Sequence, residues 1–366
     1  MVKMKKIVIN KKDLKQNLKI INSMKKKKCK IIGVVKANGM GLDLVKYSKF
    51  LVENNIKILA VSETEDAFTL RKNKITADIL LLTPENDKKQ LEKLVKNNII
   101  ITLASLGQAE ILKELSEKYK KKIDVHLKID TGMGRYGFLY NQYDEIIKTY
   151  EMNEYLNIKG IYTHFSNAIN SKDTYKQFER FEKALDYIKQ KGFKVDFAHC
   201  CNSTAFIKYT NMHLDAVRLG SIIQGRTLIK IENLKKIGEF NTNITQIKNL
   251  PIGYNIGYGN TYKTKKETKI AIIPVGHTDG FETRNKRDNF SFKENIKSIC
   301  IEARKMFKKE NAFVYIKNKK YPVVGRIGLN YSVIDITGAE DVDLNSNVVL
   351  LSPPLNVNSV IRREYI

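Results

Sequence analysis

Between residues 30 and 218 the sequence alternates short apolar runs, rich in β-branched residues, with segments of helical periodicity. Eight such runs occur, at residues 30–36, 57–62, 78–83, 99–103, 123–129, 157–164, 194–199 and 214–218. Most are almost continuously apolar, as expected of parallel strands that are buried on both faces. Eight β–α repeats predict an α/β fold, a (β/α)8 TIM-type barrel. The alternative, an open doubly wound sheet, lacks a Gly-x-Gly-x-x-Gly segment after the first run.

The pattern changes after residue 228, where short strand-like stretches replace the alternation. These stretches are residues 268–275, 312–316, 321–324, 332–336 and 347–351, with a helical pattern at 290–309. We therefore expect the barrel to span residues 9–228 and a mainly β domain to span residues 229–366. Residues 1–8 could add a strand to that second domain.

The chain is strongly basic, with 65 Lys and Arg against 39 Asp and Glu, a net charge of +26. Such a charge attracts nucleic acid, but the basic residues are scattered along the chain and no helix-turn-helix or RNA-recognition signature accompanies them. We expect no nucleic-acid partner. No apolar run reaches the ~18–20 residues of a membrane helix, and residues 7–9 are too short an apolar stretch for a signal peptide. The four cysteines have no metal-ligand spacing, so we expect no metal site and a cytoplasmic protein without a membrane partner.

Polar residues follow the expected strand ends, which is where barrel enzymes carry their active sites. They are Lys36, Arg135, His164, Asn202, Ser203, Arg218 and Gly220. A lysine that emerges from an apolar wall and faces two arginines would have its ammonium form disfavoured by burial and like charge. Such an amine can form an imine with a carbonyl compound. Taken alone, Lys36 would be interpreted as an ordinary surface lysine.

Ser203 and Gly220 follow the seventh and eighth strands, where barrels commonly hold a phosphate group. The small residues Gly220 and Ser221 would let backbone N–H groups approach an anion closely. An imine-forming Lys36 beside a phosphate site suggests pyridoxal 5'-phosphate as the cofactor.

The sequence resembles the bacterial alanine racemase family of fold-type III pyridoxal-phosphate enzymes. The most specific matching segment is Asp130-Thr131-Gly132-Met133-Gly134-Arg135. Other matches, in family order, are Val34-Val35-Lys36-Ala37-Asn38, Tyr162-Thr163-His164-Phe165, Asn202-Ser203, Val217-Arg218-Leu219-Gly220, Ile256-Gly257-Tyr258-Gly259, residues 274–281 and Val324-Gly325-Arg326-Ile327. The resemblance extends from about residue 7 to residue 350.

By position, the resemblance implies two bases on opposite faces of the substrate carbon. Lys36 would bind the cofactor aldehyde as an imine and act on one face. Tyr258 would act on the other face, contributed by the second subunit of a homodimer. His164 would link Tyr258 to Arg218, and nearby positive charge would favour the phenolate.

The remaining roles also come from the resemblance. Arg218 would hydrogen-bond the pyridine nitrogen, which should stay unprotonated because arginine does not give up its proton readily. Ser203, Gly220 and Ser221 would bind the phosphate. Arg135 would contact the substrate carboxylate or the phenolic oxygen, and Leu329 would contact the substrate. Lys128 lies nearby, and in relatives that lysine can be carbamylated.

Four features depart from the family pattern. Met40 replaces a phosphate-binding tyrosine, and His277 replaces the tyrosine before the downstream Ala-Asp-Gly segment. Gly328-Leu329-Asn330 replaces Cys-Met-Asp, and Val360 is the nearest counterpart of a second phosphate-contacting tyrosine. Two lost hydroxyl donors could weaken cofactor retention, since hydrogen bonds to charged groups are worth roughly 1.5–3 kcal/mol each.

The sequence thus predicts pyridoxal-phosphate-dependent racemisation of L- and D-alanine, which supplies D-alanine for peptidoglycan. Racemisation of serine or of a broad set of amino acids stays open, because discrimination of one methylene is worth only ~1–3 kcal/mol. A decarboxylase or aldolase of the same fold is a second class of enzyme. A pyridoxal-phosphate carrier without activity and a basic nucleic-acid-binding protein are the non-enzymatic alternatives.

Overall fold

The computed structural model describes residues 5–283, 296, 299–301, 303 and 312–366. The chain divides into two compact units, Lys11–Ile237 and Met1–Asn10 with Gly238–Ile366. The boundary at 237 lies later than the expected 228. The reason is that the backbone N–H of Ile237 donates to the Gln224 carbonyl (3.0 Å), and Asn17 Nδ2 donates to the Lys235 carbonyl (2.7 Å). These bonds keep residues 229–237 with the first unit.

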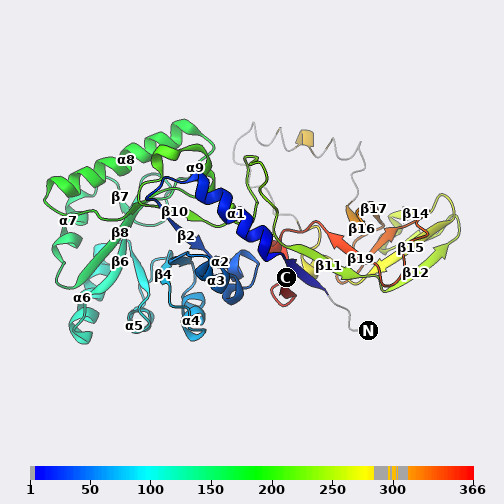
Figure 1. Cartoon of the computed structure of the whole chain (residues 1–366), viewed down its shortest axis with the longest axis horizontal. Helices are drawn as coiled ribbons and strands as arrows, with labels where there is room; N and C mark the ends of the chain where they lie inside the picture. Colours follow the sequence, from blue (N-terminus) through cyan, green and yellow to red (C-terminus); the bar gives the residue numbers. More distant parts are fainter. Residues whose placement is uncertain (1–4, 284–295, 297–298, 302, 304–311) are drawn as a thin grey trace. The chain divides into compact units, whose positions relative to one another are not determined.

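The first unit is a closed barrel of eight parallel strands (Figure 1). In order around the barrel they are β2 (Lys30–Val34), β3 (Ile58–Val61), β4 (Asp78–Leu81), β5 (Ile100–Leu103), β6 (Ile123–Asp130), β8 (Leu156–Tyr162), β9 (Ala198–His199) and β10 (Ala216–Leu219). Pairing of β5 with β6 and of β10 with β2 closes the ring. The predicted TIM-type barrel is confirmed, and each of the eight apolar runs overlaps one of its strands. A short β7 (Phe138–Leu139) adds to β6 outside the ring.

Helices cover the outside of these strands (Figure 1). They are α1 (Lys11–Met24), α2 (Lys36–Met40), α3 (Leu44–Glu53), α4 (Thr64–Lys72), α5 (Lys88–Lys96), α6 (Leu106–Tyr119), α7 (Tyr143–Glu151), α8 (Ser171–Gln190) and α9 (Ser203–Lys208). One layer of the interior is a cluster of small and branched side chains from five strands: Ile32, Ala60, Leu80, Ile100 and Ala216. Because these side chains fill the barrel, a ligand can enter only beyond the strand ends.

Strands β2 and β8 end two residues earlier than the sequence suggested. We expected Lys36 and His164 to be the last residues of their strands, but β2 ends at Val34 and β8 at Tyr162. Lys36 instead begins the short turn α2, and His164 is the second residue of the connection from β8 to α8. Apolar composition continues past the last ladder hydrogen bond, so it does not mark where pairing stops.

The second unit is mainly β, as predicted. Its largest sheet has nine strands in the order β12-β15-β18-β17-β16-β19-β11-β1-β20. Their bounds are β1 (Lys6–Ile9), β11 (Glu239–Asn243), β12 (Gln246–Leu250), β15 (Thr268–Ile273), β16 (Phe313–Ile316), β17 (Lys319–Val324), β18 (Ser332–Asp335), β19 (Asn347–Leu350) and β20 (Arg362–Tyr365). β1 pairs with β11 and β20, which is how the N-terminal residues join this unit. The helical pattern at 290–309 falls almost entirely outside the described residues.

A two-residue hairpin turn joins β16 and β17. Ile316 pairs with Lys319, and the intervening Lys317 and Asn318 both have positive φ, 49° and 64°. That conformation matches the right-handed twist of the flanking strands. A smaller ribbon, β13 (Asn255–Ile256) with β14 (Tyr262–Lys263), carries Tyr258 in the loop between its strands. No helix within the described part of the chain is long and apolar enough to cross a membrane.

Candidate active site

A cavity of about 320 Å³ opens at the carboxyl ends of the barrel strands. Its lining includes residues from seven of the eight strand ends: Val34, Lys36, Met40, Ser62, Leu82, Thr83, Lys128, Arg135, Tyr136, Tyr162, His164, Asn202, Ser203, Thr204, Arg218, Gly220 and Ser221. The barrel therefore brings together every site residue that we predicted within residues 9–228. Tyr258 and Leu329 belong to the other compact unit and do not line this cavity.

Lys36 stands at the start of an unusual left-handed turn. Ala37, Asn38, Gly39 and Met40 all have positive φ, between 51° and 66°. Non-glycine residues in this conformation cost roughly 1–2 kcal/mol each, so the fold stores strain next to the lysine. The predicted partial desolvation of Lys36 is wrong for the single chain, because the side chain is exposed in its own barrel. The reason is that the turn places Lys36 beyond the end of β2, whose apolar residues we expected to bury its side chain.

Arg218 is buried at the centre of the cavity floor. Nη2 donates to the carbonyls of Thr163 (2.7 Å) and Cys200 (3.1 Å), and Nη1 donates to the carbonyl of His199 (3.2 Å). These carbonyls belong to the ends of two neighbouring strands, so the barrel itself fixes the guanidinium. No carboxylate is among the hydrogen-bond partners of Arg218 in the described chain. Its positive charge is therefore available to a ligand in the cavity.

Hydrogen bonds connect three histidines to the Arg218 guanidinium, two directly and the third through His199. Nη2 of Arg218 lies 3.2 Å from Nδ1 of His164, and Nη1 lies 2.6 Å from Nδ1 of His199. Nε2 of His199 is 3.0 Å from Nδ1 of His126. Burial, reinforced by the Arg218 charge, lowers the pKa of His164 and His199 well below the ordinary value. Burial also lowers the pKa of His126 to about 3. All three imidazoles are thus neutral at physiological pH.

Lys128 extends into the same cavity from β6 and is buried. Its ammonium lies 4.6 Å from the centre of the Tyr162 ring and has only a long contact, 3.5 Å, to the Ile129 carbonyl. Burial first, and then the charges of Arg218 and Arg135, lower the pKa of Lys128 well below its usual value. Burial raises the pKa of Tyr162 to about 12, and its hydroxyl bonds Thr102 Oγ1 at 2.7 Å. Burial therefore disfavours the ammonium form of Lys128 and the phenolate form of Tyr162.

Asp130, the last residue of β6, organises the loop that follows that strand. Its carboxylate accepts four backbone N–H bonds from residues 132–135, at 2.9, 2.9, 3.2 and 3.2 Å. Burial alone would raise the pKa of Asp130, but these bonds outweigh it and lower the pKa. Gly132 and Gly134 have positive φ, 131° and 67°, which glycine adopts without strain. The carboxylate thus folds the loop that presents Arg135 at the cavity mouth.

The predicted phosphate site forms a concave cradle. The backbone N–H groups of Gly220 and Ile222 both point at Ser203 Oγ, at 3.4 Å each. A Cβ on Gly220 would approach Val34 Cβ to 3.3 Å and the Met40 methyl to 3.5 Å. A side chain at position 220 would therefore fill the space that an anion needs. The thioether of Met40 borders this cradle, where the family pattern has a hydroxyl.

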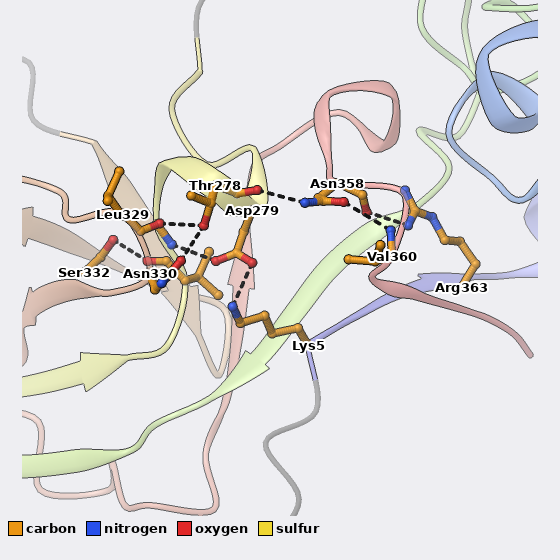
Figure 2. A network of polar contacts seen from close by, with 11 residues as sticks. Lys5, Thr278, Asp279, Leu329, Asn330, Ser332, Asn358, Val360 and Arg363 are labelled. Carbon is orange, nitrogen blue, oxygen red and sulfur yellow. Dashed lines mark hydrogen bonds and ion pairs between the residues drawn. The ribbon is translucent and has the colours of Figure 1, made fainter.

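In the second unit, the segments that depart from the family pattern form one hydrogen-bonded network (Figure 2). Thr278 Oγ1 donates to the Leu329 carbonyl (2.8 Å) and bonds Asn330, and Asn358 Nδ2 donates to the Thr278 carbonyl (3.2 Å). The N–H of Val360 donates to Asn358 Oδ1 (3.2 Å). Lys5 and the N–H of Gly276 hold the carboxylate of Asp279 at 2.7 and 3.0 Å. The loops at 276–280, 328–331 and 357–363 are therefore one connected surface.

Large side chains of this surface, Leu329 and Val360, and the nearby Tyr258 face solvent. Tyr258, Leu329 and Val360 are 66%, 67% and 84% exposed. Tyr258 also contacts the Tyr331 ring, with centroids 6.2 Å apart. Side chains of this kind exposed together indicate a surface that contacts another molecule.

The surroundings of the cavity contain no metal site: no group of three or more His, Cys, Asp or Glu residues in the described ranges could hold a metal ion. The cysteines that lie in the barrel, Cys29, Cys200 and Cys201, are buried free thiols.

Comparison with known families accounts for both units. The model "Alanine racemase, N-terminal domain" matches residues 9–227, and the model "Alanine racemase, C-terminal domain" matches residues 237–363. The chain belongs to the alanine racemase family. It is therefore an isomerase of the amino-acid racemase class, and the resemblance stated from the sequence is confirmed.

Relatives in the alanine racemase family cover almost the whole chain. The alanine racemase of Methanococcus maripaludis is 35% identical over 92% of this chain and 86% of its own length. Alanine racemase 1 of Caldanaerobacter subterraneus subsp. tengcongensis is 31% identical over 93% and 83%. Among solved structures, the alanine racemase of Clostridium difficile 630 has a TM-score of 0.84 at 30% identity, covering 96% of this chain and 88% of that chain.

Two histidines of the site, His126 and His199, were not among the predicted residues. For His126 the sequence contained a signal. Polar residues alternate at positions 126, 128 and 130, although the strand that includes His126 was expected to be buried on both faces. Alternation puts all three on one face, and all three are buried in the barrel. His199 gave no such signal, because it ends a strand of only two residues.

Proposed function

We propose that this family member interconverts L- and D-alanine with pyridoxal 5'-phosphate as its cofactor. The observation that carries the proposal is one cavity of the barrel. It unites Lys36, the carboxylate-free guanidinium of Arg218 and the concave cradle at Ser203 and Gly220. An amine, a fixed cation and an anion cradle are the three groups that a phosphorylated pyridine aldehyde requires.

The residues present fit that cofactor. Ser203 Oγ and the N–H groups of Gly220 and Ile222 already point at each other and would hold the phosphate. Arg218 would hold the ring nitrogen, because both of its terminal nitrogens are fixed by the protein. When bound, the cofactor supplies an aldehyde for the substrate amine and a ring that accepts electrons as the Cα proton leaves.

Racemisation needs one proton-transferring group on each face of Cα. Lys36 lines the cavity and would act on one face. Tyr258 of the partner subunit would act on the other, because Tyr258 is two-thirds exposed and available to a second copy. A partner seated over the cavity would also cover Lys36, which its own barrel leaves exposed. The homodimer is thus part of the proposal.

His164 and Arg218 would support the tyrosine. Nη2 of Arg218 donates to Nδ1 of His164, so Nε2 of His164 carries its proton and can donate to a phenolate oxygen. The positive charge of Arg218, uncompensated by any carboxylate among its hydrogen-bond partners in the described chain, favours the phenolate form. Arg135 would bind the substrate carboxylate from the loop that Asp130 folds.

Two structural observations bear on carbamylation of Lys128 and on the expected cytoplasmic location. A neutral Lys128 amine is the form that could take up carbon dioxide as a carbamate, as relatives of this chain can do. Three buried free thiols are compatible with the reducing cytoplasm, where we expect the enzyme to supply D-alanine for peptidoglycan.

The test is exchange of the Cα proton in deuterated solvent, followed for both enantiomers by chiral chromatography across a full amino-acid panel. We expect deuterium incorporation and interconversion for alanine from either side. Lys36→Ala should abolish both, and Tyr258→Phe should suppress interconversion from one enantiomer more than the other. Release of carbon dioxide or an aldehyde instead would identify a decarboxylase or aldolase. A coloured but inert protein would contradict the proposal.

A further inference from the structure

The barrel has a second cavity at its amino end. It measures about 440 Å³. Its lining is Asn22, Lys25, Lys27, Lys28, Cys29, Lys30, Ile31, Asn54, Asn55, Ile56, Lys57, Ile58 and Asp78. These residues lie at the amino ends of β2, β3 and β4 or in the segments that precede them. The cavity thus opens at the end of the barrel opposite Lys36, and the proposed racemase chemistry does not use it.

The charge of this cavity is one-sided. Five lysines line it, and the described residues form no ion pair with any of the five. The single acid of the lining, Asp78, is bound by Lys159 at 3.3 Å, and Lys159 also contacts Asp124 at 3.4 Å. Like charges gathered at one concave site repel each other, and a bound anion would relieve that repulsion.

The excess of basic residues over the whole chain does not by itself explain this arrangement. On α8, for example, lysines are interleaved with acids such as Glu179, Glu182 and Asp186. In the amino-end cavity the lysines come from two separate chain segments, residues 25–30 and residue 57, and converge on one hollow.

The floor of the cavity is apolar. The side chains of Cys29, Ile31 and Ile56 are buried beneath the lysines, and Ile58 is half-buried. Ligand sites of about 300–1,000 Å³ usually combine such an apolar floor with a few polar groups. A rim of ammonium groups binds phosphate as point charges. An extended duplex would instead need a basic stripe along the surface.

We propose that the amino end of the barrel binds a small organic polyanion with two or more phosphate groups and an apolar or aromatic body, of the nucleoside polyphosphate class. The phosphates would lie among Lys25, Lys27, Lys28, Lys30 and Lys57, and the body would lie on the isoleucine floor. The site is independent of the proposed function, since none of its residues lines the cavity at the carboxyl end.

The test is calorimetric titration of the full-length protein with ATP, tripolyphosphate and adenosine at low salt. We expect one ATP per chain, weaker binding of tripolyphosphate because it has no body, and no detectable binding of adenosine. The double variant Lys28→Glu/Lys57→Glu should weaken ATP binding at least about tenfold, since each charge reversal removes a phosphate contact. The matched control Lys172→Glu/Lys176→Glu, with the same charge change on exposed positions of α8, should bind ATP like the parent.

The proposed site is wrong if the protein does not bind ATP at low salt, or if the Lys28/Lys57 variant binds ATP as tightly as the parent. It is also wrong if both double variants lose the same affinity for ATP. Displacement of ATP by a short DNA duplex that binds more tightly would instead identify a nucleic-acid site. Racemase activity, measured in parallel, should be the same in both double variants and the parent. A failure of the polyanion site is thereby distinguished from a failure of the proposed function.

Discussion

Arg218 donates a hydrogen bond through Nη1 to Nδ1 of His199 over 2.6 Å, and both side chains are buried. Because a guanidinium can only donate, Nδ1 of His199 accepts and its proton resides on Nε2. That Nε2 lies 3.0 Å from Nδ1 of His126 and donates to it. Backbone carbonyls and neutral imidazoles, and not a carboxylate, therefore hold the guanidinium in place. The arrangement fixes its orientation while leaving its charge undiminished.

Removing this acceptor should impair turnover more than folding. In His199→Leu, Nη1 of Arg218 keeps only the backbone carbonyl of residue 199, so the guanidinium is less firmly oriented. We expect kcat for alanine racemisation to fall at least about tenfold, which corresponds to ~1.4 kcal/mol, while the cofactor absorbance is retained. Chiral assay and cofactor titration measure the two effects.

The matched control for that variant is His213→Leu. His213 is also buried and is stacked on Phe206, but its hydrogen-bond partners are the Phe206 carbonyl and the Lys26 N–H and not Arg218. If His213→Leu lowers kcat as much as His199→Leu, the orientation argument is wrong and the loss reflects packing alone.

Lys128 should make stability depend on pH in a defined direction. Burial holds the pKa of Lys128 in the folded chain well below the pKa of a lysine in the unfolded chain. At a pH between the folded and the unfolded pKa, the unfolded chain binds more protons, so stability rises with pH. Lys128→Met removes the cost of burying the amine. The variant should therefore gain stability over the parent at about pH 7, and the gain should shrink as the pH approaches the unfolded lysine pKa of ~10.4.

Urea unfolding across this pH range measures the effect. Lys122→Met, at the exposed residue directly before β6, serves as the control and should show no such slope. A pH-independent difference between Lys128→Met and the parent would show that Lys128 is not destabilised by burial of its charge.

The left-handed turn after Lys36 predicts that glycine is favourable at position 37. Ala37 has φ 51° and ψ 61°, which glycine adopts without a Cβ clash. Ala37→Gly should raise the free energy of unfolding by about 0.5–1 kcal/mol, despite the greater entropy of the unfolded chain. In contrast, Ala109→Gly within α6 should lower it by at least about 1 kcal/mol. A loss of stability in Ala37→Gly would contradict the strain assigned to the turn.

Met40 offers a test of the phosphate cradle. Its methyl lies about 3.5 Å from where a Cβ on Gly220 would stand, so a tyrosine at position 40 would carry a hydroxyl toward the cradle. Met40→Tyr should tighten cofactor binding about tenfold or more, since a hydrogen bond to a charged group is worth roughly 1.5–3 kcal/mol. Met40→Phe supplies the ring without the hydroxyl and should not. Equal affinities for the two variants, measured by fluorescence titration of the apoprotein, would place the phosphate elsewhere.

Much of the barrel could be predicted from the sequence, because the eight strands are local apolar runs buried on both faces. The ends of the strands could not, as Lys36 and His164 illustrate. Both residues continue an apolar segment in the sequence, yet both lie beyond the last strand residue. Where pairing stops depends on the neighbouring strand and not on the segment itself.

The sequence by itself determined the alternation of strands and helices, the family motifs and the residue types that reach the barrel rim, since all of these are encoded in short stretches of chain. Only the tertiary structure decided that His126 and His199 extend the support of Arg218, that Lys36 is exposed in its own barrel, and that lysines from two segments converge at the amino end. Burial and hydrogen bonding between residues far apart in the chain set those properties, and they exist only once the ring of strands closes.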